Sequence, residues 1–332
     1  MGAKVSVLLS NTPDVGTVLE LAELAESTGL SRVWLAETAG LDAAGLGAVI
    51  AARTSLEIGT AIVPVYSRTP ALLAMTAGTW ARLGGGDRPV HLGIGAGGQV
   101  IVERWHGMPF DRPLDSVRDT LRVLRQALAA ERTSYAGPAR HSDGFRLALG
   151  PVPSAKVYIG GMGPKMQALG AEEADGLIVT WLSPRVLETF SADFTRTVQA
   201  AGRERADVTL VARAYVAVTD DVDGTREAVR RELVEYVVSP PYGRYFRSVG
   251  FGDEVDAVTT GFTARDRERA VAGVSDRLLD EVLVVGKSAD EVTDRLTAYL
   301  AAGADDLMVQ PVPEARGGDQ RRTVAALAAL AG

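Results

Sequence analysis

Short apolar runs alternate along the chain with longer amphipathic stretches, and this alternation predicts a regular succession of strands and helices. The predicted strands cover residues 5–9, 32–36, 56–63, 89–94, 157–159, 177–179, 208–218 and 307–309. These runs are apolar almost throughout, as in the strands of a parallel sheet covered by helices. Successive strand–helix units without a linker predict one α/β domain over residues 1–332. We expect a (β/α)8 TIM barrel with its active site at the carboxyl ends of the strands.

Helix starts are marked by side chains that can accept hydrogen bonds from the free N–H groups of a first turn. Asp14 precedes a helical pattern, Ser183 stands directly before Pro184, and Ser288 and Glu291 form a capping box. A proline suits the first helical position because the N–H group that it lacks would have no partner there. These signals predict helices between most of the strands.

Two segments interrupt this rhythm. Residues 131–154 are polar and broken by Gly and Pro, with one alternating piece at 145–149, so we predict a hairpin there. Residues 222–280 contain a Pro-Pro pair and an aromatic group that includes Tyr242 and Tyr245. We interpret 222–280 as an insertion before the last strand that contributes loops over the active end of the barrel.

Composition excludes several classes of function. The net charge of −7 and the absence of a basic tract argue against general nucleic-acid binding. The chain has no Cys, and His91, His106 and His141 are not arranged at metal-ligand spacing, so we expect no metal site. We interpret these histidines as internally bonded or surface residues. Because no apolar run is long enough for a signal peptide or a membrane span, we expect a cytoplasmic protein that does not associate with membranes.

The stretch with the most specific chemistry is the turn Gly160–Gly161–Met162–Gly163–Pro164, which follows one predicted strand and opens a helix. Unpaired N–H groups at such a turn, together with the helix dipole, favour an anion such as a phosphate. A plainer alternative is a tight turn that needs glycine only for its positive φ angles. Either way, the turn lies at the strand ends where the active site is expected.

The other strand ends carry small residues and one acid. Ala61–Ile62–Val63, Ala96–Gly97–Gly98 and Thr180–Trp181 all fall there, and Glu37 is the titratable acid among them. Glu37 could donate a proton, accept a hydrogen bond from a ligand, or hold the neighbouring helix. A site with so few acids and bases suggests that a flat cofactor supplies the difficult chemistry.

Three ordered segments carry a resemblance to a known family. Residues 59–64 are followed by Arg68 and Pro70, residues 92–97 by Trp105, and residues 160–166 lead into 174–176. These segments resemble the third strand, the fourth strand end and the phosphate segment of the luciferase-like monooxygenase superfamily. The similarity is greatest to the branch that uses the deazaflavin coenzyme F420, which includes methylenetetrahydromethanopterin reductase.

The resemblance implies roles for particular residues. Gly160, Gly161 and Thr180 would hold the phosphate of the cofactor, with Met162, Gly163 and Pro164 completing that turn. The peptide between Ala61 and Ile62 would be cis and bulge under the deazaflavin ring, with Val63 and residues Ala96, Gly97 and Gly98 also lining the cofactor. Glu37 would match an acidic position near the polar edge of the ring.

The chain departs from the sugar-phosphate dehydrogenases of this group. Thr38 stands where the resemblance leads one to expect their catalytic histidine, and Gly98 where it leads one to expect their glutamate. Glucose 6-phosphate is therefore not an expected substrate, and we assign substrate contacts to Trp181, Tyr242 and Tyr245.

The resulting hypothesis is an F420-dependent oxidoreductase that transfers a hydride to or from an unidentified small organic molecule. The alternatives are an FMN-dependent monooxygenase of the same fold and a non-catalytic protein that binds a flavin or deazaflavin. We also expect a homodimer.

Overall fold

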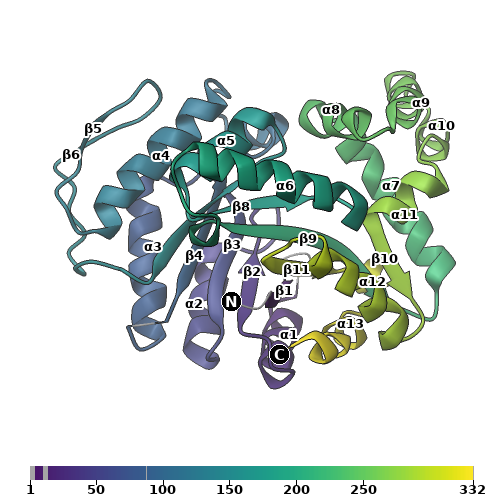
Figure 1. Ribbon diagram of the computed structural model, residues 1–332, viewed down its shortest axis with the longest axis horizontal. Coiled ribbons are helices and arrows are strands. Elements are labelled where there is room, and N and C mark those ends of the chain that lie inside the picture. Colours follow the sequence, from purple (N-terminus) through teal and green to yellow (C-terminus); the bar gives the residue numbers. More distant parts are fainter. Residues whose placement is uncertain (1–3, 10–13, 87, 332) are drawn as a thin grey trace.

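Parallel strands close into a ring at the centre of the computed structural model, which describes residues 4–9, 14–86 and 88–331 (Figure 1). Around the ring the order is β1, β2, β3, β4, β7, β8, β9 and β11, and β11 pairs again with β1. Their bounds are β1 Lys4–Leu8, β2 Arg32–Leu35, β3 Glu57–Pro64, β4 Val90–Gly95, β7 Ala155–Gly160, β8 Gly176–Thr180, β9 Thr209–Val218 and β11 Asp306–Pro311. The predicted (β/α)8 barrel is confirmed.

Helices cover the outer face of the ring, and their apolar sides pack on the outward side chains of the strands. They are α1 Val15–Ser27, α2 Ala43–Arg53, α3 Pro70–Leu83, α4 Pro113–Leu128, α5 Pro164–Glu173, α6 Pro184–Ala200, α12 Ala289–Ala301 and α13 Gln320–Ala326. The predicted caps are present: Asp14, Ser183 and Ser288 each accept a hydrogen bond from a backbone N–H three residues on. Short 3-10 turns lie at Arg205–Asp207, Glu314–Arg316 and Leu327–Leu330, and a π-helical turn at Ile101–Trp105.

The hairpin lies within residues 131–154, but not where the alternating pattern placed it. Its strands are β5 Ser134–Ala136 and β6 His141–Asp143, whereas residues 145–149 form no strand. Leu147 is buried in the main core, and Leu149 lies over Gly78 of α3. The alternating side chains of 145–149 therefore pack against the barrel helices instead of pairing in a sheet.

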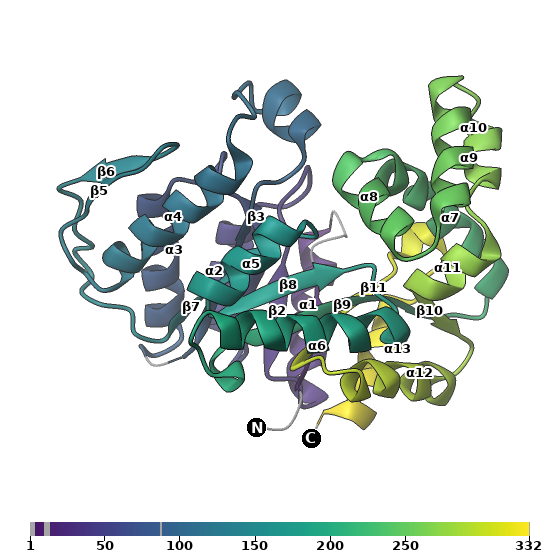
Figure 2. The same ribbon diagram turned by 45° about the horizontal axis from the view of Figure 1, so that its top comes forward.

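Residues 222–282 are helical, so the expectation of loops in this segment was wrong. They form α7 Val222–Val238, α8 Pro240–Ser248, α9 Gly252–Thr263, α10 Arg267–Ala272 and α11 Asp276–Val282. Their apolar faces build a second core, which includes Leu233, Val258 and Leu278. An unpredicted strand, β10 Leu283–Gly286, follows them and pairs with the last part of β9, outside the ring. In Figure 2, α8 to α10 and the segment between β4 and α4 rise from the same end of the barrel.

The amino ends of the strands are closed by a buried polar network. Arg32 donates hydrogen bonds to Asp306 at 2.5 Å and to Glu57 at 2.6 Å, and His91 lies 2.9 Å from Glu57 and 3.1 Å from the Tyr158 hydroxyl. Burial and the Arg32 charge lower the pKa of His91 to about 4. Burial alone would raise the pKa of Glu57, but the His91 hydrogen bond and Arg32 outweigh it, and the pKa falls to about 2. His91 is internally bonded, as expected.

Candidate functional site at the carboxyl ends of the strands

The third strand bulges where the sequence predicted. The Ala61–Ile62 peptide is cis, and the pairing of β3 with β4 shifts register between Thr60 and Val63. The Ile62 carbonyl accepts a hydrogen bond from the N–H of Glu37 at 3.2 Å. The predicted cis peptide is confirmed, and it lies beside the end of β2.

Glycines on the next two strands make room for this bulge. A Cβ on Gly160 would lie 2.5 Å from Cγ2 of Ile62, and a Cβ on Gly95 would lie 3.2 Å from its Cδ1. A side chain at Gly160 would therefore collide with Ile62, and one at Gly95 would require Ile62 to move by a few tenths of an ångström. Ala61 itself is 8% exposed and packs in the small inner cluster that includes Trp34 and Tyr158. The result is an end face along β3, β4 and β7 on which the bulged strand lies close to its neighbours, with the Ile62 side chain packed against both small glycine residues.

The segment after β4 borders this face. Gly97 has a φ of +71°, and a Cβ there would lie 3.1 Å from Pro64 at the end of β3. Ala96 is partly buried, while Gly97 and Gly98 are exposed, and the Gly98 carbonyl accepts from Val102 at 3.0 Å. The three residues predicted to line the cofactor thus lie beside the bulged strand.

The glycine turn after β7 contains both hydrogen-bonded and unbonded backbone N–H groups. The Gly161 N–H donates to the Ile178 carbonyl at 3.3 Å. Among the described residues, by contrast, no acceptor bonds the N–H groups of Met162 and Gly163. Gly163 is the N-cap of α5 and brings no capping side chain, and Pro164 occupies the first turn as predicted. The free N–H groups at this helix start are suited to an anion.

The reason for glycine in this turn differs from the plainer alternative. Neither Gly160, Gly161 nor Gly163 has a φ angle in the left-handed region. A Cβ on Gly161 would instead lie 2.6 Å from Cβ of Met166, on the first turn of α5. Glycine is required at 160 and 161 by close packing, and the positive-φ explanation is wrong.

Glu37 has protein partners. Its carboxylate accepts hydrogen bonds from Arg68 at 2.5 to 3.0 Å and from the Ala43 N–H at 3.3 Å. Arg68 also contacts Asp42, the N-cap of α2, and the pKa of Arg68 is raised because these two carboxylates outweigh its burial. This geometry matches the third reading of Glu37, a carboxylate that holds the neighbouring helix. Its direct role toward a ligand stays a prediction.

A polar wall stands opposite the small residues. Ile178, Val211 and Met308 face the barrel interior, and two residues further along the same strands come Thr180, Arg213 and Gln310. Side chains two apart on a strand share a face, so these three also point inward, one layer nearer the mouth. The buried Thr180 Oγ1, Arg213 Nε and Gln310 Oε1 have no hydrogen-bond partner. Unsatisfied buried polar atoms are costly, and a bound ligand would satisfy them.

The predicted substrate residues are brought together next to this wall. Trp181 is 2% exposed, has a φ of +61°, and its Nε1 also lacks a partner. Its carbonyl accepts a hydrogen bond from the Tyr245 hydroxyl at 2.8 Å. Tyr236 links Trp181 to Tyr242, with ring centroids 4.8 and 5.3 Å apart. Burial raises the pKa of Tyr242 to about 12, so this hydroxyl is a neutral donor at physiological pH.

Sequence reasoning missed Arg213 and Gln310. A signal for Arg213 was available, because it is the one charged residue within the apolar run 208–218. A charge in the middle of a buried strand needs a partner or a function. Gln310 gave no comparable signal, since it follows directly on the short predicted strand 307–309.

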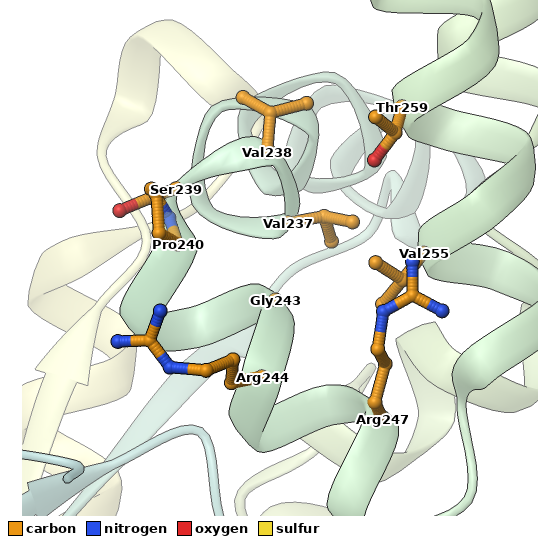
Figure 3. A pocket seen from close by; sticks show the side chains of 9 residues that line it. All are labelled: Val237, Val238, Ser239, Pro240, Gly243, Arg244, Arg247, Val255 and Thr259. Carbon is orange, nitrogen blue, oxygen red and sulfur yellow. The ribbon is translucent and has the colours of Figure 1, made fainter.

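A separate hollow of about 190 Å³ lies among α7, α8 and α9 (Figure 3). Figure 3 shows Arg244 and Arg247 at its rim, and Arg247 is paired with Asp256 at 2.5 Å. Three of its nine lining residues are Val, and none of the nine has an unpartnered buried polar atom, so we place the candidate site at the strand ends.

The described residues offer neither a metal site nor a membrane-spanning helix. No group of His, Cys, Asp or Glu there could hold a metal ion. None of the helices in the described part of the chain is long and apolar enough to cross a membrane.

Comparisons with known proteins agree with this architecture. The family model described as "Luciferase-like monooxygenase" matches residues 3–306. The "Putative coenzyme F420-dependent oxidoreductase Rv3520c" of Mycobacterium tuberculosis is 31% identical over 93% of each chain. The 5,10-methylenetetrahydromethanopterin reductase of Archaeoglobus fulgidus is 28% identical over 86% of each. The structure of the coenzyme F420-dependent tetrahydromethanopterin reductase of Methanopyrus kandleri superimposes with a TM-score of 0.83 at 20% identity, covering 99% of this chain and 98% of that one.

Proposed function

Because the chain belongs to the luciferase-like monooxygenase family, we propose that it is an oxidoreductase that uses coenzyme F420. In this proposal a hydride passes between the deazaflavin and a small organic substrate at the carboxyl ends of the strands. The Mycobacterium tuberculosis relative named as a putative coenzyme F420-dependent oxidoreductase supports this choice of cofactor. The observation that carries the proposal is the pairing of a small-residue face with unpartnered donors at one end of the barrel.

The residues at the strand ends fit such a cofactor. The glycines at 95 and 160 let the Ile62 side chain pack against β4 and β7, and a flat ring would lie on the bulged strand at Ala61–Ile62. The free N–H groups of Met162 and Gly163 and the unpartnered Thr180 hydroxyl are suited to its phosphate. Bound deazaflavin would supply a carbon that accepts or donates a hydride.

The protein would contribute position and the exclusion of water. The bulged strand would support the ring, and Trp181, Tyr236 and Tyr242, whose rings contact one another in series, would enclose the substrate. Arg68 holds the Glu37 carboxylate after the end of β2. The backbone N–H of Glu37 separately bonds the Ile62 carbonyl of the bulge. In this arrangement Glu37 orients the end of β2. Its carboxylate could transfer a proton only after breaking its hydrogen bonds with Arg68.

Equilibrium titration of purified protein with F420 and with FMN tests the proposal. We expect F420 to bind and FMN to bind more weakly or not at all. Tight FMN binding with rapid reaction of the reduced complex with oxygen would support instead the monooxygenase that the family description suggests. F420 binding without turnover on a broad substrate panel would favour the non-catalytic alternative. Sedimentation of the same sample tests the expected homodimer.

A further inference from the structure

Arg213 is a cation without an anion. Its Nε is buried and has no partner, and among the described residues no carboxylate lies within 4.0 Å of its guanidinium. Other arginines near this end of the barrel are neutralised: Arg68 by Glu37, Arg316 by Glu232 and Arg185 by Glu281. A partly buried guanidinium that the protein itself leaves unpaired is costly unless a ligand supplies the opposite charge.

The surroundings of Arg213 form a built site. Its guanidinium carbon lies over the Trp181 ring, 5.1 Å from the ring centre, within the range of a cation–π contact. The Trp181 Nε1 and the Gln310 Oε1 belong to side chains that are each 2% exposed, and both lack partners. The carboxyl ends of β8, β9 and β11 therefore carry a cation, one further donor and one acceptor that have no partner within the protein.

The donors favour a carboxylate. The free atom of Arg213 is Nε, and a guanidinium that presents Nε with a terminal nitrogen matches the two oxygens of a carboxylate. The glycine turn, on β7 and α5, already offers free N–H groups for a phosphate. The Trp181 and Tyr236 rings beside Arg213 suit the apolar body of an organic molecule. The Gln310 oxygen could accept a hydrogen bond from a hydroxyl group of that molecule.

We propose that Arg213 binds the carboxylate of the substrate, so that this enzyme acts on an organic acid whose body lies against Tyr236 and Tyr242. This inference rests on the proposed function, since it names the substrate class for the same site. Arg213 would hold the substrate with its reacting carbon toward the ring, and Trp181 would add a hydrogen bond from its indole.

The indole N–H of Trp181 provides a direct readout. The protein is labelled with ¹⁵N at the tryptophan indoles and saturated with F420, and the Trp181 resonance is assigned with Trp181→Phe. The indoles of Trp34 and Trp80, bonded to Ser6 and to the Ala44 carbonyl, serve as internal references. The probes are matched acid–amide pairs: acetate and acetamide, benzoate and benzamide, succinate and succinamide.

We expect at least one acid to shift the Trp181 resonance and to bind about tenfold or more tightly than its amide. Arg213→Gln should abolish that preference, and Arg213→Lys should keep part of it. Arg196→Gln, which removes the same charge from an exposed i,i+3 pair, should retain the preference in full. Circular dichroism checks that each variant is folded.

Two outcomes overturn the inference. One is the absence of any acid preference in the wild type, or its survival in Arg213→Gln. The other is a loss of F420 affinity in Arg213→Gln, which would assign Arg213 to the cofactor phosphate. If wild type fails to bind F420, the proposed function falls. The same titration of the free protein then still decides whether Arg213 selects carboxylates.

Discussion

The start of α5 allows a test of phosphate binding that leaves the fold intact. Gly163 is the N-cap, with φ −85° and ψ 146°, and a Cβ there would meet no atom within 4 Å. Asp and Asn are both favoured at this position and adopt these backbone angles. Gly163→Asp therefore places a carboxylate beside the free N–H groups, and Gly163→Asn places a neutral side chain of the same shape.

The expected magnitude follows from the charge. Both variants should gain a few tenths of a kcal/mol from the new cap. In Gly163→Asp the carboxylate would lie about 5 Å from a phosphate bound at the same N–H groups. The repulsion is about 0.8 kcal/mol at a dielectric constant of 80 and about 3 kcal/mol at 20. F420 should thus bind between about fourfold and about 150-fold more weakly to Gly163→Asp than to Gly163→Asn.

The assay is a fluorescence titration of F420 into wild type and both variants at low salt, repeated at high salt. Thermal melts should show both variants at or slightly above the wild-type melting temperature. The difference in affinity should shrink at high salt, because the Debye length becomes shorter. Equal affinities of the Asp and Asn variants at low salt would refute phosphate binding at this helix start.

Substitution at Gly161 would be a less specific test of phosphate binding than substitution at Gly163. Gly161→Val would bring its Cβ within 2.6 Å of the Met166 Cβ and so disturb α5 whether or not a phosphate binds. A loss of binding in that variant would not distinguish the two causes.

Three further predictions concern the candidate site and the buried polar network at the amino ends of the strands. Thr180→Val should weaken F420 binding by about tenfold, because one hydroxyl is lost. It should leave the melting temperature unchanged or higher, since the hydroxyl has no partner in the protein; full affinity would contradict this. Glu37→Gln should cost about 1–3 kcal/mol in urea unfolding, as Arg68 loses a half-buried charged partner; if stability alone changes and F420 affinity does not, Glu37 is structural. Unfolded His91 binds a proton below about pH 6.5, whereas the folded protein resists protonation until about pH 4. Stability should therefore fall by roughly 2 kcal/mol between pH 7 and 5, with a further loss below pH 4.5 as unfolded Glu57 is protonated. His91→Gln should flatten the first slope in urea titrations, and an unchanged slope would exclude His91 as its source.

The order of the elements could be read from the sequence because its signals are local. Continuous apolar runs predicted the ring strands, and Asp14, Ser183 and Ser288 marked helix starts that the structure confirms. The cis peptide after Ala61 was also predicted correctly, although from the resemblance of its motif and not from local physical chemistry. The strand β10 escaped prediction because a short apolar run after a helix does not show which strand it will pair with.

Contacts between distant residues were beyond the reach of these signals. The glycines at 160 and 161 were recognised as special, but the reason, close packing on Ile62 and Met166, depends on how three elements meet. Likewise, Glu37 was recognised as a strand-end acid, while its partner Arg68 stands 31 residues away.

By itself, then, the sequence determined the barrel, the end at which its chemistry lies and the turn that could bind a phosphate. Only the tertiary structure decided which polar atoms there remain unpaired. Thr180, Arg213 and Gln310 lie on three strands far apart in the chain, and the parallel register pairs Arg213 with Thr180 and with Met308, two residues before Gln310. Whether such side chains satisfy one another or await a ligand depends on side-chain directions set by register and packing, which no local pattern encodes.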